Sequence, residues 1–64
     1  MNFIRVHISD ESSRLINLDL VTCIKPFGNG SRIFFIETND YLDVMEKFDY
    51  LENLIFALCD TGND

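Results

Sequence analysis

The sequence predicts an α+β domain in which an antiparallel sheet of four to five strands is followed by one C-terminal helix. Apolar and polar residues alternate up to about residue 45, and turn-forming residues separate the alternating runs. From residue 47 onward the apolar residues recur every three or four positions, as on one face of a helix. Because the chain has only 64 residues, residues 1–64 are assigned to a single domain.

Five segments have the composition of short strands. In the first segment Ile4, Val6 and Ile8 share one face, because successive side chains of a strand point to opposite sides. The polar run Ser9–Ser13 then predicts a turn, and Asp19 interrupts the apolar pattern between the second and third segments. The predicted strands are residues 2–8, 14–18, 20–25, 32–38 and 41–45.

Two turn signals connect the last three strands into a meander. Asn29-Gly30 lies between extended runs and favours the positive φ angles of a type I′ hairpin turn. Asn39-Asp40 supplies the second turn. Pro26 has no N–H to donate to a ladder, so we expect it at a sheet edge or just outside the pairing.

The C-terminal helix is predicted over residues 47–59, with Gly62 as a candidate C-terminal cap. Its apolar arc is wider than contact with one sheet requires, and Phe56 lies outside even that arc. The residues at helical spacing are Phe48, Leu51, Ile55 and Leu58.

If both turns are two-residue loops, Phe27 faces Arg32 and Phe35 faces Val44, and the meander has two distinct faces. One face is continuously apolar and should receive the helix. It holds Ile24, Ile33, Phe35, Leu42 and Val44. The other face is unusually apolar for a sheet surface that meets water. It holds Cys23, Phe27, Phe34, Ile36, Tyr41 and Met45, with Lys25, Arg32 and Asp43 among them.

Two interpretations of this second face remain open. Either the sheet curls and the first two strands fold over it, or it forms an interface with another chain. Small domains often need oligomerisation for stability, and we therefore predict a non-enzymatic protein-interaction or regulatory module that self-associates, with a dimer favoured. The interface candidates are Phe34, Ile36, Tyr41 and Met45 on the sheet, or Tyr50, Leu54 and Phe56 on the helix.

Charge disfavours several classes of partner. Eleven acidic residues outnumber five basic ones, and the formal net charge of −6 repels nucleic acid and anionic membranes. The alternative function is a nucleic-acid-binding regulator that uses a basic and aromatic sheet face, with Arg5, Lys25 and Arg32 as its cations. The first eight residues lack the apolar run of a signal peptide and no segment reaches the length of a membrane span, so we expect a cytoplasmic protein that does not bind membranes.

We expect no catalytic residue, cofactor or metal site. His7 is the only histidine and has no thiol or orienting carboxylate at a suggestive spacing. Cys23 and Cys59 match neither a redox pair nor a zinc-ligand spacing, and they are interpreted as reduced thiols. The acidic residues between Asp40 and Glu52 lack the glycine and the ligand alternation of a Ca²⁺ loop. The chain is therefore not predicted to be an enzyme.

The pattern of polar residues within these apolar runs resembles the small flagellar regulatory FlbD-type proteins. The similar segments are Leu15-Ile16-Asn17-Leu18-Asp19-Leu20-Val21, then Ile24, Ile33-Phe34-Phe35 and Tyr41-Leu42-Asp43-Val44. Glu46 also fits that pattern, whereas Lys47 stands where such proteins tend to have a serine cap. The resemblance implies two hairpin strands and a C-terminal helix, and it transfers no functional residue. A fainter similarity to the strand-strand-helix part of LytTR-type DNA-binding domains adds slight weight to the nucleic-acid alternative.

Overall fold

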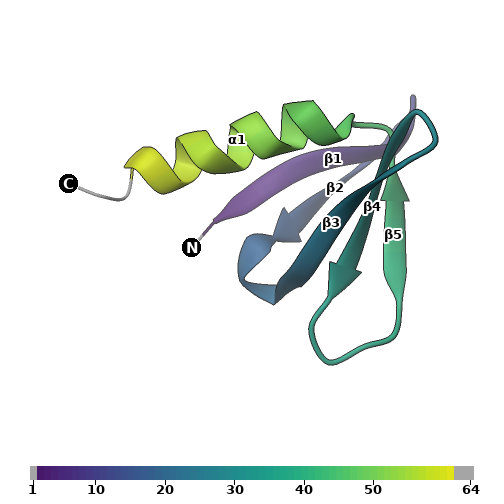
Figure 1. Ribbon diagram of the computed structural model, residues 1–64. Coiled ribbons are helices and arrows are strands. Elements are labelled where there is room, and N and C mark those ends of the chain that lie inside the picture. Colours follow the sequence, from purple (N-terminus) through teal and green to yellow (C-terminus); the bar gives the residue numbers. More distant parts are fainter. Residues whose placement is uncertain (1, 62–64) are drawn as a thin grey trace.

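The computed structural model describes the backbone of residues 2–61 and the side chains of residues 2–58. It has five strands and one C-terminal α-helix, which confirms the predicted α+β class (Figure 1). The elements are β1 (Phe3–Ser9), β2 (Ser12–Asn17), the 3₁₀ turn η1 (Leu18–Leu20), β3 (Val21–Phe27), β4 (Gly30–Phe35), β5 (Tyr41–Val44) and α1 (Phe48–Thr61). The predicted cap Gly62 lies outside the described residues. No helix within residues 2–61 is long and apolar enough to cross a membrane.

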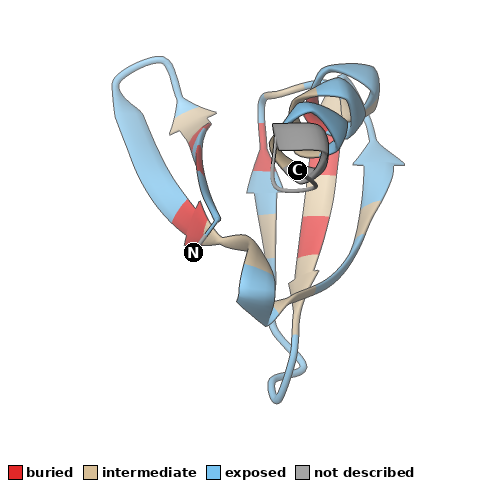
Figure 2. Ribbon diagram, turned by 90° about the vertical axis from the view of Figure 1, so that its left-hand side faces the viewer, coloured by how far each residue is buried: buried red, intermediate tan, exposed pale blue. Residues whose placement is uncertain are grey.

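The strands form two antiparallel sheets and not one. β1 and β2 make a hairpin, and β3, β4 and β5 make a meander in that order. Figure 2 shows the hairpin and the three-stranded sheet as two walls connected through η1. The end of β1 also meets the end of β5, where the Met45 N–H donates to the His7 carbonyl at 2.7 Å. The 3₁₀ turn forms where Asp19 was expected to bend the chain, and the Asn17 side chain accepts from the Asp19 N–H at 3.0 Å.

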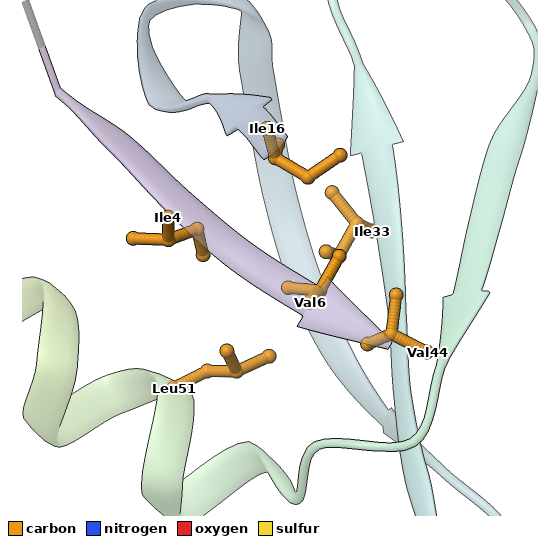
Figure 3. Close-up of a cluster of buried hydrophobic side chains, with 6 residues drawn as sticks. All are labelled: Ile4, Val6, Ile16, Ile33, Val44 and Leu51. Atoms are coloured by element: carbon orange, nitrogen blue, oxygen red, sulfur yellow. The ribbon is translucent and has the colours of Figure 1, made fainter. Parts of the chain in front are cut away.

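The core lies between the hairpin, the three-stranded sheet and the helix. Figure 3 shows its six fully or nearly buried side chains converging from five elements: Ile4, Val6, Ile16, Ile33, Val44 and Leu51. Ile24, Phe35 and Leu42 pack against this cluster from the sheet. The predicted apolar face of the meander is therefore confirmed as the inner face, and α1 packs on it.

The register of the first meander hairpin differs from the prediction. Phe27 pairs with Gly30 and Lys25 with Arg32, so the two-residue loop is Gly28-Asn29 and not Asn29-Gly30. Gly28 takes the left-handed φ of 57°, which glycine adopts without steric cost. Consequently β4 begins at Gly30, two residues before the expected start.

The second hairpin was also predicted in the wrong register. Phe34 pairs with Tyr41, so residues 36–40 form a longer loop and β4 ends at Phe35. Within this loop Glu37 has a φ of 70° and the Thr38 hydroxyl accepts from the Asp40 N–H at 3.1 Å. Both register errors are even numbers of residues, and for that reason the assignment of side chains to the two faces is unchanged.

Candidate interaction surface

The side of the three-stranded sheet that faces away from the core carries a cluster of aromatic and charged residues. Cross-strand pairing places Lys25 beside Arg32, Arg32 beside Asp43, and Phe34 beside Tyr41. We call this surface the outer sheet face. It comprises Cys23, Lys25, Phe27, Arg32, Phe34, Tyr41 and Asp43.

Arg32 is held at the centre of the outer sheet face. Its guanidinium carbon lies 3.8 Å from the ring centroid of Phe27 and 3.9 Å from that of Tyr41. It also donates two hydrogen bonds to the Asp43 carboxylate, at 2.7 and 3.1 Å. These hydrogen bonds raise the pKa of Arg32 and lower the pKa of Asp43, so both groups remain charged and the pair is neutral as a whole.

The aromatic rings on this face pack against neighbouring side chains but remain accessible. Phe34 packs against Tyr41 with ring centroids 6.0 Å apart, and the Lys25 ammonium lies 5.5 Å from the Phe34 centroid. Phe27 and Tyr41 are nevertheless 49% and 50% exposed. Contact with Arg32 fixes these rings in place while about half of each faces solvent.

The hairpin does not cover the outer sheet face. Ile4 and Val6 of β1 and Ile16 of β2 pack with Ile33 and Val44 on the opposite, inner side. The interpretation in which the first two strands fold over the second face of the meander is therefore wrong.

The other interface candidates lie around this surface or on the helix. Ile36 follows β4, Met45 follows β5, and both are exposed, whereas Phe34 is half-buried. On α1, Tyr50 and Phe56 are exposed, and Leu54 packs against the core. Packing against the core therefore accounts for Leu54, and the remaining sheet and helix candidates lie on different elements.

Two of the three cations proposed for a nucleic-acid face lie together. Lys25 and Arg32 are paired neighbours on the outer sheet face. Arg5 lies on β1, in the other sheet, and donates to the Ser13 hydroxyl at 3.1 Å. Arg5 therefore lies in a different sheet from Lys25 and Arg32.

A groove between β3 and α1 is a second surface, which the sequence analysis missed. It has a volume of about 330 Å³. It is lined by Leu18, Val21, Cys23 and Ile24 on one side and by Phe48, Leu51, Glu52, Ile55 and Phe56 on the other. The wide apolar arc of the helix, with Phe56 outside it, indicated an uncovered apolar surface but not where that surface lies.

Glu46 joins the two sheets at the junction of β1 and β5. Its carboxylate accepts from the His7 N–H at 2.8 Å and from the His7 ring nitrogen Nδ1 at 2.6 Å. Its carbonyl accepts from the hydroxyl of Ser31, which is fully buried, at 2.7 Å. Because an ionised carboxylate only accepts, Nδ1 carries the proton.

The environment of Glu46 lowers the pKa of its carboxyl group. Burial, which leaves the side chain 12% exposed, raises the pKa. Hydrogen bonds from the His7 N–H, the His7 ring and the Glu46 N–H outweigh this effect and lower it below its ordinary value. Since the pKa is depressed in the folded state, ionised Glu46 stabilises the fold at neutral pH, and this contribution is lost as the pH falls through the folded-state pKa.

We expect Glu46→Gln to reduce the free energy of unfolding by about 1–3 kcal/mol at neutral pH, because the variant loses hydrogen bonds to a charged acceptor. As the pH falls through the folded-state pKa of Glu46, which lies below its ordinary value, the difference from the unsubstituted protein should vanish, because Glu46 itself becomes neutral. Urea unfolding of both proteins at a series of pH values from neutral to acidic measures this difference in the free energy of unfolding. Asp43→Asn is the matched control, since the solvent-screened Arg32–Asp43 pair should contribute less to stability than the largely buried Glu46 carboxylate. A difference for Glu46→Gln that stays constant down to low pH would contradict this role.

Within residues 2–58, no three His, Cys, Asp or Glu side chains are placed to hold a metal ion together. The described residues offer instead two surfaces for contact with other molecules, the outer sheet face and the groove between β3 and α1. Comparison of the chain with protein-family models, curated proteins and solved structures finds no match.

Proposed function

We propose that the chain is a non-enzymatic protein-interaction module that forms a homodimer through the outer sheet face. The observation that carries the proposal is the cluster around Arg32, where Phe27 and Tyr41 are half exposed and pack against the guanidinium group. Tyrosine, phenylalanine and arginine are the residues that protein interfaces favour. Because these side chains are already fixed by mutual contact, binding costs little conformational entropy.

The small core supports self-association. Among the described residues, six apolar side chains are buried, and domains of this size commonly gain stability from oligomerisation. Covering Phe27, Tyr41 and the neighbouring Ile36 with a second copy would remove further apolar surface from water.

Charge favours the sheet over the helix as the dimer surface. A twofold interface places the same patch of each copy against the other. The outer sheet face carries both signs, Lys25 and Arg32 with Asp43, so two copies meet without a concentration of like charge. The helix surface near Tyr50 carries Asp49 and Glu52 in a chain of net charge −6, and two such surfaces repel each other.

The same geometry favours a protein over a nucleic-acid partner. Arg32 has two of its donors committed to Asp43, which leaves Lys25 as the cation of this face without a carboxylate partner among the described residues. Useful affinity for nucleic acid usually takes several phosphate contacts.

Sedimentation equilibrium over a range of concentrations tests the proposal, with Tyr41→Ser and Tyr50→Ser as a matched pair. Both tyrosines are about half exposed, at 50% and 54%, but they lie on the sheet and on the helix. We expect Tyr41→Ser to raise the dimer dissociation constant about tenfold or more, the effect of losing one buried aromatic side chain. Tyr50→Ser should change it less than about twofold.

Circular dichroism checks that both variants keep the fold. The opposite ranking of the two variants would move the interface to the helix. A protein that stays monomeric at high micromolar concentration would exclude self-association.

A further inference from the structure

The groove between β3 and α1 lies along an open strand edge. β3 is an edge strand of the three-stranded sheet and pairs with β4 on one side only. The groove is lined by both Cys23 and Ile24, which point to opposite faces of β3, since Cys23 pairs with Phe34 and Ile24 with Ile33. A cavity lined by consecutive residues that belong to opposite faces of a strand runs beside the edge of that strand. The helix forms its other wall.

Backbone groups of β3 face this edge without a partner in the meander. In a two-residue hairpin the flanking residues, here Phe27 and Gly30, exchange hydrogen bonds, and bonded and non-bonded pairs then alternate along the ladder. Lys25 therefore bonds to β4, whereas the N–H and C=O of Ile24 point to the open edge. Pro26 occupies the equivalent edge position, where its missing N–H does not weaken the pairing with β4.

We propose that this groove binds an extended, basic and apolar peptide segment of a partner protein, which adds to β3 as a further strand. The peptide backbone would pair with Ile24, and alternate side chains would lie against Ile55 and Phe56 of α1. This site goes beyond self-association and lies along the edge of β3 beside α1, where Cys23 is the one residue of the outer sheet face that also lines it.

The charge of the groove selects the partner. Glu52 is the charged side chain among the described lining residues, and the chain has a net charge of −6. A second copy of this acidic chain is repelled there, whereas a peptide with a lysine or arginine opposite Glu52 is attracted. The occupant is therefore a basic peptide and not another copy.

Isothermal titration calorimetry and amide chemical shifts of the ¹⁵N-labelled full chain test the proposal. The probe is a blocked octapeptide of alternating valine and lysine. Its control is the same peptide with alternate backbone amides N-methylated, which keeps charge and side chains but removes the donors along one edge. We expect saturable binding of the probe with shifts centred on Ile24, and an affinity at least about tenfold lower for the methylated peptide.

Two pairs of protein variants locate the peptide. Phe56→Ser should weaken binding about tenfold. Leu15→Ser alters a side chain of similar exposure on β2, 61% exposed against 60% for Phe56, and should leave binding unchanged. Glu52→Gln should weaken binding about two- to fivefold, with Asp43→Asn as the control for net charge.

Several results would overturn the proposal. Equal binding of the methylated peptide would show attraction by net charge alone, and shifts centred on Phe34 would place the peptide on the outer sheet face. An absence of saturation up to about 1 mM would also exclude the site. Tyr41→Ser should still bind the probe, so this outcome is separate from that of the proposed dimer.

Discussion

Gly30→Ala is expected to abolish or nearly abolish folding. A Cβ atom at Gly30 would lie 2.0 Å from the Val44 carbonyl oxygen, 3.1 Å from the Val44 carbonyl carbon and 3.2 Å from the Met45 Cα. All three are backbone atoms, and no side-chain rotation relieves the overlap, so β4 and β5 must separate. We expect a loss of about 3 kcal/mol, the upper end of the usual cost of overpacking. A single small core rarely supplies more than about 3–5 kcal/mol, and most of the stability would therefore be lost.

Gly28→Ala is the matched control for this prediction. Gly28 has a φ of +57°, and a Cβ there meets no atom within 4 Å, so alanine costs only the strain of the left-handed conformation, about 1–2 kcal/mol. Urea unfolding of both variants gives the two free energies. If Gly28→Ala proved the more damaging substitution, the close approach of Gly30 to β5 would not be what sets the hairpin register.

The same contact explains why the hairpin register could not be read from the sequence. Gly28-Asn29-Gly30 contains two overlapping two-residue loops, and the Asn-Gly pair is the stronger local signal. The choice of Gly28-Asn29 depends on β5, because only glycine at position 30 fits beside Val44. A third strand, distant along the chain, therefore decides a turn that the local residues leave open.

The alternation of apolar and polar residues correctly predicted which side chains face the core, but it did not predict which residues pair between neighbouring strands. Ile33 and Val44 are core residues as expected, because shifts by an even number of residues preserve the face. The Arg32–Asp43 ion pair was missed, because the predicted register placed Asp43 opposite Ile36. The groove was missed for a different reason: it depends on where α1 lies relative to the edge of β3, and no local pattern encodes that position.

Leu51→Ala is expected to have the other large effect, because Leu51 attaches the helix to both sheets. Leu51 is fully buried and packs in one cluster with Ile4 and Val6 of the hairpin and Ile33 and Val44 of the meander (Figure 3). Replacing a buried leucine with alanine costs about 2–5 kcal/mol through lost transfer free energy and the cavity that remains. The melting temperature should fall by at least about 10 °C, as thermal circular dichroism would show.

Leu15→Ala makes the same chemical change on β2, where the side chain is exposed, and it should alter stability by less than about 0.5 kcal/mol. Equal effects of the two substitutions would mean that α1 is not attached through Leu51. The Leu51 substitution should also affect the two binding surfaces differently. Because Leu51 also lines the groove beside β3, a destabilised Leu51→Ala chain should lose peptide binding even where enough of it remains folded to be measured. The outer sheet face, to which α1 contributes none of its defining residues, should then still support the dimer in the folded fraction.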